Sequence, residues 1–153
     1  FGPSDTMFEQ EGWRKYDDQN IFAKIIRGEI PSYKIFETDH ALAILDAFPS
    51  TPGHSLLIPK SLGAVSVMDM SPQDIANTLK ELPRLTRLVM QATGAEGCNI
   101  VQNNGPASGQ VVMHPHFHVI PRVEGDGLLR HPRSASAMLS PEEGKAILAK
   151  MNE

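Results

Sequence analysis

The sequence predicts an α+β fold, with an antiparallel five-stranded sheet, two main helices and a short C-terminal helix. Three observations support this prediction. Five short apolar segments are separated by turn residues, as in strands that follow one another over turns. Two stretches repeat apolar residues at the three- and four-residue spacing of a helix. The C-terminal stretch opens with helix-capping residues.

The composition fits one globular domain, because 41% of the 153 residues are hydrophobic and 21% are charged. A net charge of -4 provides no broad basic surface, so we expect neither nucleic acid nor a membrane as a partner. No apolar run reaches the ~20 residues that span a bilayer, and the first residues lack the apolar core of a signal peptide. The single cysteine, Cys98, cannot form an intramolecular disulfide. We therefore expect a cytoplasmic protein.

Residues 1–19 are polar and mixed in charge, and we interpret them as an N-terminal arm. Trp13 and Tyr16 are its large aromatic anchors, and a partner subunit is one surface on which the arm could dock. Residues 1–4 contain no initiator methionine, which indicates processing or a cloning remnant, with Met7 as a candidate start.

The first helix follows this arm. Asn20 is a candidate N-cap, and Gly28 with Pro31 ends the helix, because proline cannot continue it. The apolar stripe comprises Ile21, Phe22, Ile25 and Ile26.

A second helical stripe covers residues 71–93, where Ser71 is the predicted cap. Pro83 lies inside this stripe and lacks the N–H of an interior helix residue, which predicts a kink or two shorter helices. The same capping pattern at Ser140 opens a terminal helix that runs to about Met151. The five predicted strands cover residues 33–37, 41–46, 54–59, 98–103 and 111–121.

Three of the six histidines, His114, His116 and His118, alternate within the last predicted strand. Alternate residues of a strand lie ~6.6 Å apart on one face, so we expect the three imidazoles to line one surface. Such a patch can supply a nucleophile, a proton donor and cationic stabilisation near neutral pH.

Two other interpretations suit the same pattern. Partly buried histidines often serve only as hydrogen-bonded structural residues, and alternate histidines also bind zinc, copper or iron. No cysteine or carboxylate stands beside the three histidines in the sequence, so we expect no metal and no cofactor.

A polar, glycine-rich loop precedes the histidines and contains Asn103, Gly105, Ser108, Gly109 and Gln110. Side-chain donors and unhindered backbone N–H groups are the material of a phosphate-binding loop. An ordinary hairpin loop has a similar composition, but attachment to the histidine strand favours phosphate binding.

The run from His114 to Ile120, H-P-H-F-H-V-I, resembles the His-φ-His-φ-His-φ-φ motif of the histidine triad (HIT) superfamily, in which φ is apolar. The similarity extends to N-I-F-A-K-I-I-R-G-E-I-P at residues 20–31, I-L-D at 44–46 and H-S-L-L-I-P-K at 54–60. The order and spacing are similar to the Hint-like branch and its bacterial relatives. The resemblance divides the chain into the arm (1–19), a HIT domain (20–122) and a C-terminal segment with the terminal helix (123–153).

The resemblance implies a homodimer with the HIT-like α+β fold that binds a purine nucleotide or a nucleotide conjugate. By position, His116 is the nucleophile, and His54 is a fourth active-site histidine. His114 and His118 flank His116, where they orient its ring and contact phosphate or the leaving group. Asp46 matches the carboxylate that accepts hydrogen bonds from ribose hydroxyls. The matching apolar base pocket comprises Ile21, Phe22, Ile25 and Ile44, and the phosphate side comprises Asn103, Gly109 and Gln110.

Three positions depart from the family pattern. Val111 stands where many relatives carry serine or threonine near the leaving group. Pro115 removes a backbone N–H from the predicted strand, which suits only an edge or an unpaired position. Asn20 and Ala23 replace the Cys-x-x-Cys pair of zinc-containing bacterial relatives, so the resemblance implies no structural zinc.

The resemblance predicts a phosphoramidase or dinucleoside polyphosphate hydrolase, or a related transferase, that acts at an α-phosphate in two steps through a nucleotidyl-histidine. The leaving group is either an amine or a nucleotide. Because of Val111, a catalytically weak nucleotide-binding or scaffold protein stays open as an alternative. A metal-binding protein that uses the three histidines is a further alternative.

Overall fold

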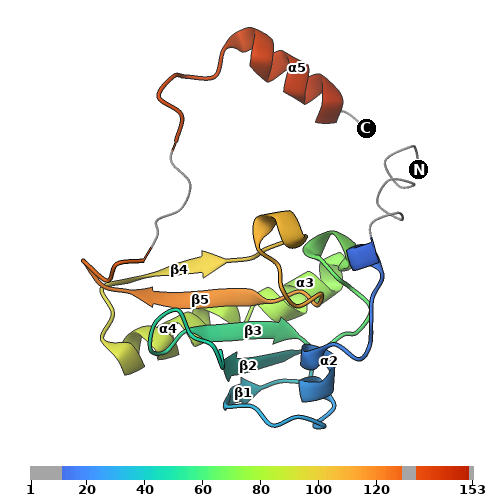
Figure 1. Cartoon of the computed structure of the whole chain (residues 1–153), viewed down its shortest axis with the longest axis vertical. Helices are drawn as coiled ribbons and strands as arrows, with labels where there is room; N and C mark the ends of the chain where they lie inside the picture. Colours follow the sequence, from blue (N-terminus) through green and yellow to red (C-terminus); the bar gives the residue numbers. More distant parts are fainter. Residues whose placement is uncertain (1–11, 129–133, 152–153) are drawn as a thin grey trace.

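The computed structural model describes residues 12–128 and 134–151, and its centre is a five-stranded antiparallel sheet (Figure 1). The strands lie in the order β1-β2-β3-β5-β4. Their bounds are β1 (Lys34–Glu37), β2 (Ala41–Leu45), β3 (Ser55–Pro59), β4 (Gly97–Val101) and β5 (Phe117–Arg122). The predicted α+β fold with five antiparallel strands is therefore confirmed.

The helices begin and end where the sequence predicts caps and breaks. The side chain of Asn20 caps α2 (Ile21–Ile26) by accepting a hydrogen bond from a backbone N–H of the first turn at 3.0 Å. The stripe over residues 71–93 forms two helices, α3 (Pro72–Leu79) and α4 (Leu82–Thr93). Pro83 fits the first turn of α4, where no N–H is needed, but not the interior of one continuous helix. The terminal helix α5 (Pro141–Met151) follows Ser140, whose hydroxyl caps its first turn.

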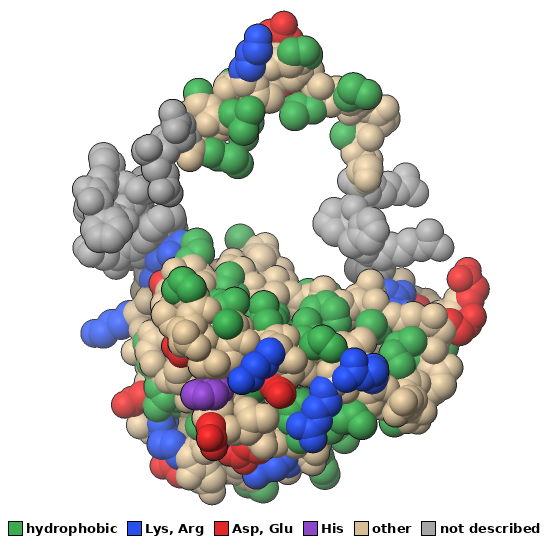
Figure 2. Space-filling model, turned by 180° about the vertical axis from the view of Figure 1, so that it is seen from behind, with side chains coloured by type: hydrophobic (Ala, Val, Ile, Leu, Met, Phe, Trp, Pro, Cys, Tyr) green, Lys and Arg blue, Asp and Glu red, His purple; other side chains and the backbone are tan. Residues whose placement is uncertain are grey.

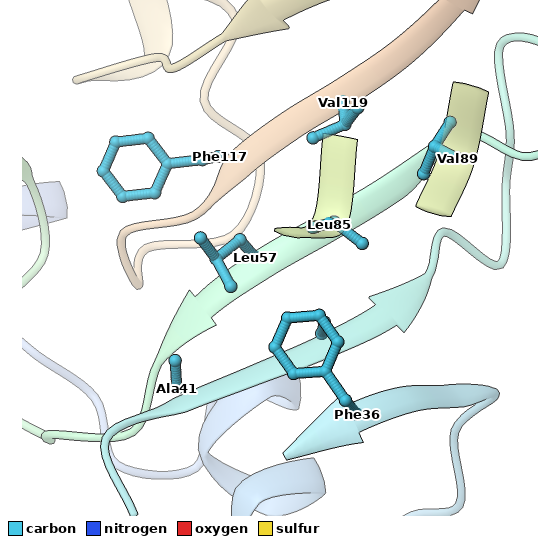
Figure 3. Close-up of a cluster of buried hydrophobic side chains, with 8 residues drawn as sticks. Phe36, Ala41, Leu57, Leu85, Val89, Phe117 and Val119 are labelled. Atoms are coloured by element: carbon cyan, nitrogen blue, oxygen red, sulfur yellow. The ribbon is translucent and has the colours of Figure 1, made fainter. Parts of the chain in front are cut away.

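Alternating side chains give the sheet two apolar faces. On one face, Leu57, Phe117 and Val119 pack against Leu85 and Val89 of α4 (Figure 3). On the opposite face, the apolar cluster consists of Leu42, Ile44, Leu56 and Ile58 together with Phe22 of α2. The helices α3 and α4 thus cover one side of the sheet, and the short α2 covers the other.

The last strand begins later than the sequence predicts. We expect a strand over residues 111–121, whereas β5 begins at Phe117. Pro115 has no N–H to donate to a neighbouring strand, so the chain before Phe117 does not join the ladder. The prediction that three histidines alternate within one strand is therefore wrong: His118 belongs to β5, whereas His114 and His116 lie in the irregular segment that enters it.

Short 3₁₀ turns complete the described elements: η1 (Gly12–Arg14), η2 (Val67–Asp69) and η3 (Pro106–Ser108). Seen from behind, the surface carries basic and acidic side chains side by side, without a broad field of one sign (Figure 2). Within the described ranges, no helix combines the length and apolarity needed to cross a membrane.

Candidate active site

The histidine segment enters the sheet beside β3, on the face covered by α2. His118 pairs with Leu56 of β3, and Leu56 pairs in turn with Ile44 of β2. Directly paired residues of antiparallel strands point to the same face, so these three side chains form a row across the sheet. Phe22 belongs to the same apolar cluster, and Ile25 packs against it. The fold therefore brings predicted base-pocket residues and a predicted catalytic histidine onto one face.

His116 has one ring nitrogen fixed by the backbone. Its Nδ1 lies 2.7 Å from the carbonyl oxygen of His114, and a carbonyl oxygen can only accept. Nδ1 therefore carries the proton, and Nε2 of the neutral ring carries the lone pair. None of the described residues hydrogen-bonds to Nε2. The ring is 6% exposed and packs edge-on against Phe22, with 4.8 Å between centroids. An imidazole in this state is a nucleophile.

A chain of hydrogen bonds determines which nitrogen of His118 carries the proton. The backbone N–H of Ser50 donates to Nδ1 of His54 at 3.0 Å, so neutral His54 has its proton on Nε2. This Nε2 lies 2.9 Å from Nδ1 of His118 and donates to it. Neutral His118 then has its own proton on Nε2, from which it can donate to a ligand. The centroids of the His116 and His118 rings are 5.0 Å apart, so the nucleophile and this donor are neighbours.

The ring of His114 is fully buried and points into the protein. Its Nε2 lies 2.8 Å from the carbonyl oxygen of Pro59, and its Nδ1 lies 2.9 Å from the hydroxyl of Tyr16. Both ring nitrogens are therefore occupied. This geometry fits the predicted role of His114 in orienting His116, whereas neither nitrogen is free for the predicted contact with phosphate.

Burial favours the neutral form of all four histidines. It lowers the pKa values of His114 and His116, and burial together with the nearby His116 and His54 lowers the pKa of His118 to about 4. Burial also lowers the pKa of His54, against the opposite effect of Asp46. His54 is thus neutral at neutral pH, and its 3.5 Å contact with Asp46 is not an ion pair.

The loop before the histidines is held from inside by Gln110, which is 4% exposed. Its Oε1 accepts from the N–H of Gly105 at 2.7 Å, and its Nε2 donates to the carbonyls of Val65 at 2.7 Å and Val112 at 3.0 Å. The side-chain amide is therefore used within the protein. The predicted phosphate contact of Gln110 stays a prediction, and its side chain supports the loop.

Asn103 and Gly109 lie together at the other side of this loop. The side-chain nitrogen of Asn103 is 3.9 Å from the point that a Cβ of Gly109 would occupy. Gly109 has φ of 104°, which glycine adopts without strain. Within the described chain the Asn103 side chain makes no hydrogen bond, so its amide is available to a ligand.

Asp46 follows β2 and comes close to the histidines through the fold. One of its oxygens accepts from the N–H of Phe48 at 2.8 Å, and its side chain is 18% exposed. Of the other predicted pocket residues, Ile44 is buried, whereas Ile21 is 46% exposed at the start of α2. Asp46 and Ile21 can therefore both be reached by a ligand.

The described residues contain one group that could hold a metal ion, formed by Asp46, His54 and His118. Their ligand atoms lie within 4.8 Å of one another. The fold brings the carboxylate of Asp46 to the histidines, although no carboxylate stands beside them in the sequence. His114 and His116 are not in this group, and both ring nitrogens of His114 already have hydrogen-bond partners, so the described residues do not form a metal site on the three triad histidines. An ion bound here would replace the hydrogen bond between His54 and His118.

Three residues that make hydrogen bonds in the site belong to no sequence motif. Ser50 donates to His54, Pro59 accepts from His114, and Tyr16 contacts His114 from the arm. The first two act through backbone atoms, which leave no trace in residue type. Tyr16 has one signal in the sequence, its aromatic ring in an otherwise polar arm.

Comparison with known proteins identifies the family of the chain. A family profile of the HIT domain matches residues 27–125. The chain is 44% identical over 108 residues to the adenylylsulfatase HINT3 of Arabidopsis thaliana, covering 71% of this chain and 54% of that protein, so it spans about half of that relative. It is 39% identical over 132 residues to the adenosine 5'-monophosphoramidase hnt1 of Schizosaccharomyces pombe, covering 83% of this chain and 91% of that protein. The crystal structure of a HIT family protein from Bacillus subtilis matches with a TM-score of 0.80 at 34% identity, covering 87% of this chain and 94% of that one. The chain therefore belongs to the histidine triad (HIT) family.

Proposed function

We propose that the chain is a purine nucleotide hydrolase or transferase that acts at an α-phosphate, with Nε2 of His116 as the nucleophile. The observation that carries this proposal is the 2.7 Å contact from Nδ1 of His116 to the His114 carbonyl, because it leaves the lone pair on Nε2. The names of two relatives support the substrate class, since they refer to an adenylyl sulfate and to an adenosine 5'-monophosphoramidate.

The reaction takes two steps. In the first, the Nε2 lone pair of His116 forms a bond to phosphorus, and the leaving group departs with the electrons of its own bond to phosphorus. An amine leaving group also takes up a proton from solvent. The His116 ring becomes cationic, and the His114 carbonyl stabilises this charge through the Nδ1–H. In the second step, a water molecule attacks phosphorus and loses a proton to solvent, and His116 recovers its lone pair. An acceptor other than water makes the protein a transferase.

The other side chains have separate proposed roles. The Nε2–H of His118 donates to a nonbridging oxygen or to the leaving group, and the amide of Asn103 binds phosphate oxygens beside Gly109. The N–H of Gly109 itself donates to the carbonyl of Pro106 at 3.0 Å. The carboxylate of Asp46 accepts from ribose hydroxyls. The base lies in an apolar pocket that contains Ile21, Phe22, Ile25 and Ile44. We also propose that the protein acts as a cytoplasmic homodimer, with residues 20–122 as its HIT domain.

Turnover by His116→Ala tests the function. The substrates are an adenosine phosphoramidate, an adenylyl sulfate and a dinucleoside polyphosphate, each with and without a chelator. We expect His116→Ala to lose activity while it still binds AMP, because the pocket and Asp46 remain. His40→Ala is the matched control, since His40 is exposed and outside the site. Activity within about tenfold of wild type in His116→Ala excludes the proposed nucleophile.

The same experiment separates the alternatives. A nucleotide-binding or scaffold protein would bind AMP and turn over none of the three substrates. Val111 gives this alternative its physical basis, because the side chain is 86% exposed and offers no hydroxyl to a leaving group. An enzyme that depends on an ion at Asp46, His54 and His118 would lose its activity after chelation.

A further inference from the structure

We infer that Tyr16 of the N-terminal arm is a positioning residue for the nucleophile: its hydroxyl holds His114, whose carbonyl oxygen fixes the ring of His116. This inference rests on the proposed role of His116. Its basis is the contact of 2.9 Å between the Tyr16 hydroxyl and Nδ1 of His114, which joins residues 98 positions apart in the chain.

The direction of the hydrogen bonds follows from the acceptors. Nε2 of His114 faces the carbonyl oxygen of Pro59 at 2.8 Å, and this oxygen can only accept. Nε2 therefore carries the proton of neutral His114, and Nδ1 is an acceptor. The hydroxyl of Tyr16 must donate to it. The His114 ring is thus held at both nitrogens, by β3 on one side and by the arm on the other.

This anchoring reaches the nucleophile through one residue. His114 uses its ring to bind Tyr16 and Pro59, and it uses its backbone carbonyl to accept from Nδ1 of His116 at 2.7 Å. A fully buried ring fixed at two points leaves the backbone of His114 little freedom. The carbonyl oxygen is therefore held in the direction that keeps the lone pair of His116 on Nε2.

The arm has further contacts that hold Tyr16 in place. The ring of Trp13 packs on Gly105 of the polar loop, where a Cβ would come within 3.2 Å of it. After Tyr16, Asn20 caps α2, and Phe22 of that helix packs edge-on against His116. Residues 13–22 therefore run from the polar loop, past His114, to the nucleophile. The described part of the arm thus contacts its own domain, and docking of the arm on a partner subunit stays a prediction.

Removal of the hydroxyl isolates this effect. Tyr16→Phe retains the ring and loses only the donor, which leaves a buried acceptor on His114 without a partner. We expect the single-turnover rate of His116 adenylylation to fall about tenfold, whereas the Kd for AMP changes less than about twofold. In ¹⁵N NMR spectra, the Nδ1 resonance of His114 should shift because it loses a donor. Tyr33→Phe is the matched control, since Tyr33 is 72% exposed, and it should change none of these quantities.

A second variant separates positioning from packing. If the hydroxyl positions His114, Tyr16→Phe shows most of the loss of rate found in Tyr16→Ala. If the ring acts only by packing, Tyr16→Phe matches wild type and only Tyr16→Ala is slow, which overturns the inference. An unchanged Nδ1 resonance in Tyr16→Phe also overturns it. If Tyr16→Phe reacts at the wild-type rate while His116→Ala is inactive, only this inference is overturned. If His116→Ala is active, the proposed function is overturned as well.

Discussion

Replacement of Gln110 by methionine should strongly destabilise the polar loop. Methionine has a similar length and shape but none of the hydrogen-bonding groups, so Gln110→Met removes the bonds to Gly105, Val65 and Val112 without opening a large cavity. The side chain is 4% exposed, so water cannot easily replace them. One N–H and two carbonyls then lack partners, and each such group costs about 1–3 kcal/mol.

With the low end of this range for each group, the free energy of unfolding falls by about 3 kcal/mol, equivalent to a Tm about 10 °C lower. Urea unfolding followed by circular dichroism measures the change. Gln91→Met is the matched control, because Gln91 is exposed on α4, and it should stay within about 0.5 kcal/mol of wild type. A loss below about 1 kcal/mol for Gln110→Met would refute the reasoning, since the three groups would then have other partners.

Four further predictions concern the site. Burial lowers the pKa of the nucleophile His116, and the pKa of His118 is about 4, so the acid midpoint of kcat/KM should lie below pH 6.5; a midpoint near 6.5 in the pH–rate profile would contradict this. The same shift means that the unfolded chain takes up a proton first as the pH falls, so the free energy of unfolding in urea titrations should decrease from pH 6.5 towards 4. Asp46→Ala should weaken ribonucleotides far more than 2',3'-dideoxynucleotides in calorimetric titrations, and an equal loss would make Asp46 structural. Phe22→Ala should lower the free energy of unfolding in urea by about 3 kcal/mol and weaken AMP binding, because the ring belongs to the apolar cluster and packs on His116. Unchanged AMP binding would show that Phe22 does not line the base pocket.

Most of the fold could be predicted because its signals are local. Asn20, Ser71 and Ser140 mark helix starts through short-range hydrogen bonds, and Pro83 divides a helix for a reason contained in its own ring. The start of β5 was harder to predict, because the apolar pattern runs through Pro115 and gives no sign of where pairing stops. The hydrogen bonds between strands join distant segments of the chain through backbone atoms, so residue type is a poor predictor of where they begin.

For the site, too, local sequence signals could be predicted and long-range contacts could not. The motif identifies the triad histidines, and the family pattern adds His54 and Asp46, whose geometry here places them beside His118. What could not be predicted is which nitrogen of each ring carries the proton. That depends on backbone atoms at Ser50 and Pro59 and on the approach of an arm residue across the fold. The alternation of residues within one segment contains no information about such contacts.

Capture of the covalent intermediate tests the central role of His116 most directly. The protein is mixed with an adenosine phosphoramidate, quenched in base within a single turnover, digested and examined by tandem mass spectrometry. The account predicts an adenylyl group on Nε2 of His116, formed before AMP is released and absent from His116→Ala. Release of AMP at full rate with no adenylylated histidine, or with the group on His114 or His118, would contradict it.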